Sequence, residues 1–227
     1  MLYQLTFALA CLWPVSSIDP KIEETCQFLI NEVLTENCEP SLIFSLSIAA
    51  PEHIRYQELS NLMEVQALRL LYAELGSEQV DFSVGYFQMK PSFVETLEDR
   101  IRNDEALQDQ YADLIGYYAS ELSAIRQERI DRILNVKYCK RYLMAFEQIL
   151  RKEYKADLDP LSPKEQLHFM ATAYNMGWGH STKDIQTYQT RKRFPYGAGY
   201  IGEQHAFGDL SIRIFDHLNK LLCIPNH

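Results

Sequence analysis

The chain has 227 residues, of which 47% are hydrophobic, enough to fill the core of one domain. It carries 22 basic and 31 acidic side chains, a formal net charge of −9, and so lacks the positive field that would hold nucleic acid. Aromatic residues make up 12% of the chain, a content that suits either an aromatic core or a groove whose rings stack on sugars.

The first 17 residues resemble a secretory signal peptide. They include no charged side chain, and their apolar run is too short to span a bilayer as a helix. Val15 and Ser17 are small enough to occupy the positions three and one before a cleavage site. We therefore expect export, removal of residues 1–17, and a single domain over residues 18–227.

Two other interpretations of this segment stay open. It could form a buried N-terminal helix of the folded domain. Cleavage could also occur earlier, after Ala10, with a lipid attached to Cys11. We expect the protein to associate with a membrane only if Cys11 is lipidated.

Four cysteines follow the signal segment, and export would allow them to form two disulfides in any of three pairings. They are Cys26, Cys38, Cys139 and Cys223. None of them has the spacing of a zinc site, and the histidines do not form a metal-binding pattern with each other. We predict neither a metal nor a cofactor.

The first half of the chain reads as a series of helices. Apolar residues recur at three-to-four spacing from Ile22, which predicts a helix ending near Asn37. The apolar stretch Leu42 to Ala50 meets Pro51, which disfavours α geometry at Ala50 and predicts a bend there. The pattern over 59–71 predicts another helix, closed by Gly76.

The second half continues this pattern after a break at 81–89. We expect a helix from Pro91 and two or three more over 107–154. Ser162-Pro163-Lys164-Glu165 is a capping box and predicts a helix from Pro163 to about Asn175. A glycine-rich stretch and a last helix over 210–221 close a mainly α domain with at most a small β-hairpin.

Three short motifs stand out from this helical background. They are Ala50-Pro51-Glu52, Ser83-Val84-Gly85-Tyr86-Phe87-Gln88-Met89, and Ala173-Tyr174-Asn175-Met176-Gly177. Their order resembles the lytic transglycosylases of the lysozyme-like superfamily, over roughly residues 42–201. Here Glu52 lies between Pro51 and His53, whereas the family usually has serine after its glutamate. A later stretch, 194–201, is similar to the family's tyrosine motif.

The resemblance implies a lysozyme-like fold and a bacterial cell-envelope location, either periplasmic or secreted. Glu52 would be the catalytic acid and base, although Glu58 and Glu64 are rivals and any glutamate can be a solvated surface charge. The implied substrate-binding residues are Ser83, Gly85, Gln88, Met89, Tyr174, Asn175 and Tyr200. The partner would be the glycan strand of peptidoglycan.

A single glutamate suits the transglycosylase reaction, which cleaves the β-1,4 bond between N-acetylmuramic acid and N-acetylglucosamine and leaves a 1,6-anhydro product. Glu52 would need a raised pKa, which apolar neighbours such as Ile48, Phe87 and Met89 would provide. Two alternatives stay open. If Asp81 or another group activates water, the protein would be a muramidase similar to goose-type lysozymes. In the second alternative, the protein would bind glycan in the cell envelope without cleaving it.

Overall fold

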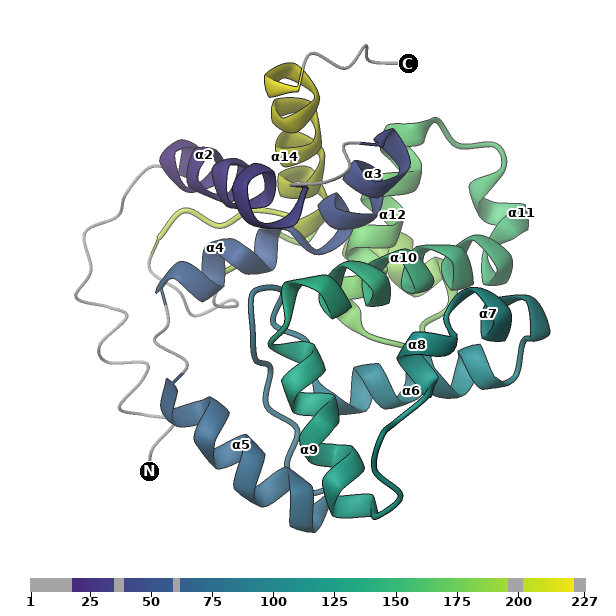
Figure 1. Ribbon diagram of the computed structural model, residues 1–227. Helices are drawn as coiled ribbons and strands as arrows, with labels where there is room; N and C mark the ends of the chain where they lie inside the picture. The colour runs from purple at the N-terminus through teal and green to yellow at the C-terminus, as the bar shows by residue number, and fades with distance from the viewer. Residues whose placement is uncertain (1–17, 35–38, 59–61, 196–201, 223–227) are drawn as a thin grey trace.

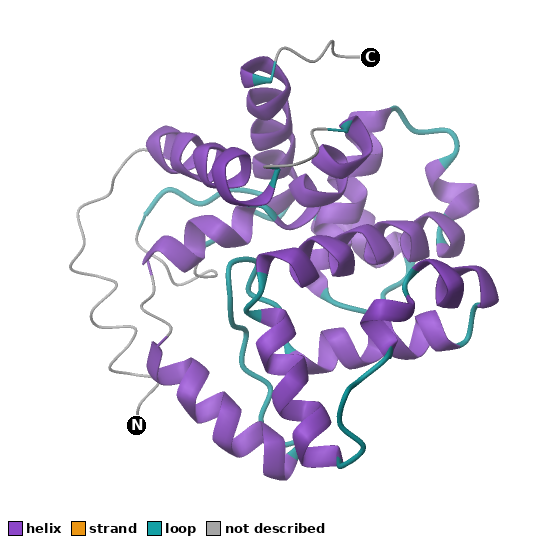
Figure 2. Ribbon diagram, viewed as in Figure 1, coloured by secondary structure: helices purple, strands orange, loops and turns teal. Residues whose placement is uncertain are grey.

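The computed structural model describes residues 18–34, 39–58, 62–195 and 202–222, and within these ranges the chain is mainly helical (Figures 1 and 2). Two isolated β-bridges, Val84 with Met89 and Phe194 with His205, are the only extended pairings among the described residues. The predicted mainly α class is therefore confirmed. In the described part of the chain, no helix is both long and apolar enough to cross a membrane.

Three N-terminal helices pack against the last helix, α14 (Phe207–Leu221), in the upper part of Figure 1. They are α2 (Ile18–Phe28), α3 (Pro40–Ala49) and α4 (Pro51–Glu58). The π-helix η1 (Leu29–Val33) continues α2 and contacts α10. Helix α3 is apolar on all sides and buried from Leu42 onward, as expected of a central core helix. It contacts α10, α12 and α14.

The middle of the chain forms a second group of helices, in the lower part of Figure 1. They are α5 (Leu62–Leu75), α6 (Pro91–Arg102), α7 (Glu105–Gln110), α8 (Ala112–Ile115), α9 (Leu122–Ile133) and α10 (Val136–Glu153). Helices α5 and α9 pack along each other, and α10 joins this group to α3. Four helices thus occupy the region where we predicted two or three.

The remaining helices are α11 (Lys155–Leu158), α12 (Pro163–Met176) and α13 (Thr182–Tyr188). Helix α12 begins at the predicted capping box, in which Ser162 accepts from the backbone of Glu165 and the Glu165 carboxylate accepts from the backbone of Ser162. It ends one residue beyond the predicted Asn175. Two further predictions are confirmed. Helix α6 begins at Pro91, and Gly76, which follows α5, has a positive φ.

One local prediction needs correction, and another is left open. The first helix changes to π-helical hydrogen bonding at Leu29 and runs in that form to Val33, while its predicted end near Asn37 lies outside the described residues. Ala50 keeps helical dihedral angles (φ −54°, ψ −33°) despite Pro51, because it is fully buried and its carbonyl accepts from the His53 N–H at 3.0 Å. Pro51 still separates α3 from α4, since it has no N–H with which to continue the α3 ladder.

The structure describes two of the four cysteines for which disulfides were considered. Cys26 and Cys139 are buried free thiols, so neither takes part in a disulfide. Each sulfur points to a backbone carbonyl, Cys26 to Ile214 and Cys139 to Ile133, and burial raises the pKa of both thiols to about 12. Both therefore act as small apolar core residues. Cys11, Cys38 and Cys223 lie outside the described residues.

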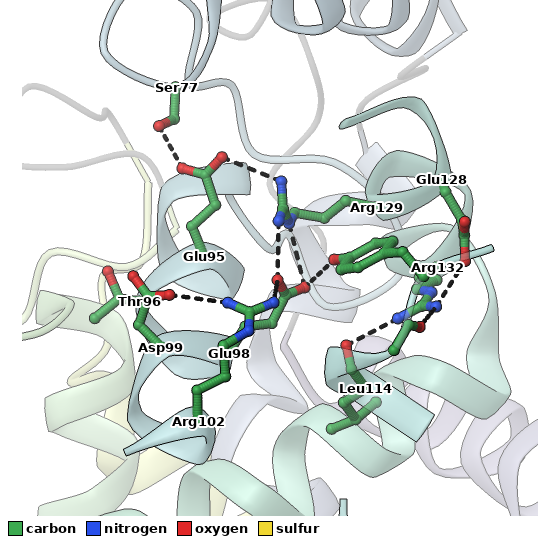
Figure 3. A network of polar contacts seen from close by, with 12 residues as sticks. Ser77, Glu95, Thr96, Glu98, Asp99, Arg102, Leu114, Glu128, Arg129 and Arg132 are labelled. Carbon is green, nitrogen blue, oxygen red and sulfur yellow. Dashed lines mark hydrogen bonds and ion pairs between the residues drawn. The ribbon is translucent and has the colours of Figure 1, made fainter. Parts of the chain in front are cut away.

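A buried polar network ties α6 to α9 (Figure 3). Glu98 of α6 is fully buried and accepts hydrogen bonds from Arg129 Nε and Nη2 at 3.2 and 2.9 Å. The hydroxyl groups of Tyr117 and Tyr142 and the guanidinium group of Arg102 also reach this carboxylate. Because a buried charge is tolerated only when it is paired, this network fixes the position of α6.

Candidate active site

A cleft with a volume of about 460 Å³ lies among α4, the 81–90 loop, the start of α6 and the end of α12. Six of the eight predicted site residues line it: Glu52, Ser83, Gln88, Met89, Tyr174 and Asn175. These come from three segments that are far apart in the sequence. Of the other two, Gly85 does not line the cleft, and Tyr200 lies outside the described residues. The other lining residues include Arg55, Asp81, Lys90, Ser92, Phe93, Thr96 and Trp178.

Glu52 lies in the first turn of α4 and is only 5% exposed. Burial raises the pKa of its carboxyl group to about 7, while the nearby Arg55 acts in the opposite direction. A carboxyl group in this state is partly protonated near neutral pH and can both donate and accept a proton. The side chains of the rival residues Glu58 and Glu64 lie outside the described part of the structure.

Arg55, one helical turn after Glu52, was not identified from the sequence. Its Nη1 lies 3.0 Å from Glu52 Oε2, yet that oxygen accepts no hydrogen bond of good geometry from any described residue. Arg55 Nε and Nη2 both donate to the carbonyl of Pro195, at 3.1 and 2.8 Å. The i, i+3 spacing was the available signal, because it puts both side chains on one helix face.

The second motif forms a tight turn. Val84 and Met89 pair as an isolated bridge, and Gln88 donates from both its backbone N and its Nε2 to the carbonyl of Gly85. Gly85 has a φ of +75°, and an added Cβ would lie 2.8 Å from the carbonyl oxygen of Ile133. Glycine is therefore required here for packing against the end of α9, and the turn presents Gln88 and Met89 to the cleft.

The third motif joins the end of α12 to this turn. Tyr174 is buried, and its hydroxyl donates to the carbonyl of Phe87 at 2.8 Å. Burial, followed by the charge of the nearby Glu52, raises the pKa of Tyr174 well above its ordinary value. Asn175 is half-buried on the cleft wall, and Gly177 ends the helix with a φ of +90°.

Trp178 is a further cleft residue that the motifs did not indicate. Its indole N–H donates to the Phe93 carbonyl at 3.0 Å, the Phe93 ring stacks on it, and Arg100 lies over it at 4.3 Å. Phe93 and Arg100 thus hold Trp178 against α6 as part of the cleft wall.

Asp81 is the second carboxylate of the cleft. Its Oδ1 accepts from the backbone N–H of Ser92 at 2.9 Å, and its Oδ2 accepts from the Ser92 hydroxyl at 2.7 Å. Lys90 Nζ is 3.5 Å from the same Oδ2. Asp81 thereby satisfies one of the N–H groups left open at the start of α6, so both of its oxygens are engaged.

Comparisons with known proteins assign no family to this chain. No family model, no curated protein and no solved structure matches this chain. Among the residues that the structure describes, no group of three or more His, Cys, Asp and Glu side chains could hold a metal ion. The cleft therefore offers one buried carboxyl group, one engaged carboxylate, two cations and several amide and aromatic groups.

Proposed function

We propose that this protein cleaves the glycan strand of peptidoglycan at the β-1,4 bond between N-acetylmuramic acid and N-acetylglucosamine. The observation that carries the proposal is Glu52, a buried carboxyl group whose pKa is raised to about 7 inside a cleft. Glycosidic cleavage needs an acid that is still protonated near neutral pH. The amide groups of Gln88 and Asn175, on the same walls, suit hydroxyl and acetamido groups of a sugar.

In the proposed reaction, protonated Glu52 gives its proton to the glycosidic oxygen as the bond to the anomeric carbon breaks. The resulting carboxylate then takes the proton of the muramoyl 6-hydroxyl, whose oxygen attacks the anomeric carbon. The products are a shortened strand and a 1,6-anhydromuramoyl end, and Glu52 is protonated again. No water is consumed, and one carboxyl group is sufficient.

Hydrolysis by a second carboxylate is the main alternative, and the bonding of Asp81 supports the one-carboxylate route. A base that activates water must have an oxygen available to accept the proton. Both oxygens of Asp81 already accept from Ser92, and Lys90 lies beside one of them. This arrangement suits an N-terminal partner for α6 better than a general base.

We expect Asp81→Asn to lower the rate of strand cleavage by less than about 10-fold, equivalent to about 1.4 kcal/mol of activation free energy. The amide oxygen can still accept from Ser92, so the free energy of unfolding should fall by only about 1 kcal/mol. Asp104→Asn is the matched control, because Asp104 caps α7 outside the cleft by accepting from Leu107 N. A loss as large as that caused by Glu52→Gln would make Asp81 a second catalytic group.

The direct test is mass spectrometry of purified peptidoglycan sacculi digested with residues 18–227, beside Glu52→Gln and a sample without protein. We expect anhydromuropeptides from the wild type alone. Reducing-end muropeptides would instead indicate a muramidase. A protein that binds the sacculi and releases no soluble fragment would refute the proposal and leave a glycan-binding envelope protein as the explanation.

A further inference from the structure

Arg55 connects Glu52 to a segment that is distant in the sequence. Its guanidinium group faces the Glu52 carboxylate with Nη1 and the Pro195 carbonyl with Nε and Nη2. The same group lies over the Phe194 ring, 5.1 Å from its centroid. A planar guanidinium group held by such a fork has one fixed orientation, whereas a surface arginine samples many.

We propose that Arg55 is a positioning residue for Glu52, which holds the carboxyl group against the Phe194–Pro195 segment and sets the balance between its charged and protonated forms. Its side chain is 27% exposed and that of Glu52 is 6% exposed, so water screens their attraction only partly. Burial favours the protonated form of Glu52, and the guanidinium group favours the charged one. The two effects together keep the carboxyl group able to give and take a proton.

The other ionisable groups near Glu52 leave Arg55 as its nearest cation among the described residues. His53 on α4 is buried, which lowers its pKa to about 4 and keeps it neutral at pH 7. Tyr174 of α12 is neutral as well, because its pKa is raised. On the opposite loop, Lys90 lies beside Asp81, and the two charges offset each other.

Helices α2 and α14, which pack against α4, also carry charged side chains. Two contacts join charged side chains of these helices to each other, Arg213 with Asp19 and His217 with Glu23, and neither includes Glu52. Arg55 is consequently the group whose removal should change the titration of Glu52 most.

The test is a pH titration of the Glu52 carboxyl carbon by ¹³C NMR in the full-length folded domain without substrate. The resonance is assigned by its loss in Glu52→Gln. In Arg55→Gln we expect the pKa of Glu52 to rise by roughly one unit, the effect of losing an opposite charge at this range. Arg69→Gln is the matched control, because it removes the same charge from a pair with Asp131 outside the cleft, and it should leave the titration unchanged.

An unchanged pKa in Arg55→Gln, or an equal rise in Arg69→Gln, would overturn the proposal. If Arg55→Gln does not fold, Arg55→Lys carries the test. Lysine keeps the charge but lacks the planar fork that fixes it beside Glu52, so the charge should lie farther from the carboxyl group on average. The pKa of Glu52 should therefore still lie above its wild-type value, by less than full loss of the charge would cause. No rise in that variant would equally overturn the proposal.

The catalytic part of this inference rests on the proposed function, but the titration does not. If sacculi are cleaved, the pH above which the cleavage rate falls should increase in Arg55→Gln together with the pKa of Glu52. If sacculi are not cleaved and the NMR shift is still observed, the proposed function fails and the role of Arg55 stands.

Discussion

Replacing Glu52 by glutamine is expected to lower the rate of glycan-strand cleavage by roughly 10²–10⁴-fold, the usual contribution of a general acid or base. Glutamine has nearly the same shape and can occupy the buried position, but it has no proton to give to the leaving oxygen. The wild-type rate should fall as the pH rises through about 7, where Glu52 loses its proton. Release of soluble fragments from labelled sacculi between pH 5 and pH 9 measures both effects.

Glu147→Gln is the matched control, since Glu147 is another buried glutamate but lies on α10, bonded to Ser45 and Arg151, outside the cleft. It should retain the wild-type pH profile. Equal activity of Glu52→Gln and the wild type would remove Glu52 from the mechanism.

The raised pKa of Glu52 can also be checked without substrate, because it links stability to pH. Its folded pKa, about 7, lies above its ordinary value of 4.5, so the stability it contributes is fully present below 4.5 and is lost as the pH rises through 7. Relative to the wild type, Glu52→Gln should therefore gain up to about 3 kcal/mol in unfolding free energy between pH 4.5 and pH 8.

His53 makes this comparison between variants necessary. Its pKa is lowered from 6.5 to about 4, so its contribution to stability is present above 6.5 and is lost as the pH falls through 4. In the wild type alone the two residues act in opposite directions over the same range. Urea unfolding of both proteins at each pH isolates Glu52, and a constant difference would show that its pKa is not raised.

The largest effect on stability is expected from Glu98→Ala, which should lower the free energy of unfolding by about 3–5 kcal/mol. The substitution leaves Arg129, only 6% exposed, without the carboxylate that its Nε and Nη2 contact. For a domain of this size the melting temperature should fall by roughly 10 °C. Thermal unfolding followed by circular dichroism measures it.

The neighbouring Asp99 offers a matched control. Its carboxylate pairs with Arg102 at 2.9 Å, but its side chain is 70% exposed. Exposed ion pairs contribute at most about 1 kcal/mol, so Asp99→Ala should change stability little. Similar losses in the two variants would mean that the buried network does not hold α6 in place.

Local chemistry explains which elements could be predicted from the sequence. The capping box at Ser162, the proline at Pro91 and the glycine at Gly76 act within one turn of a helix, so their effect does not depend on the rest of the fold. The three motifs likewise indicated six residues that line one cleft. Their shared location followed from a resemblance, not from any local rule.

Only the tertiary structure decided the environment of those residues. Arg55 and Pro195 are 140 residues apart, Tyr174 and Phe87 are 87 apart, and Arg129 and Glu98 are 31 apart. The free state of Cys26 and Cys139 and the helical geometry of Ala50 depend in the same way on distant neighbours. The sequence by itself determined the helical class and those helix ends that a cap, a proline or a glycine marks, because backbone hydrogen bonds and caps are local. Burial and charge pairing, which set the pKa of Glu52, arise only when distant segments pack together.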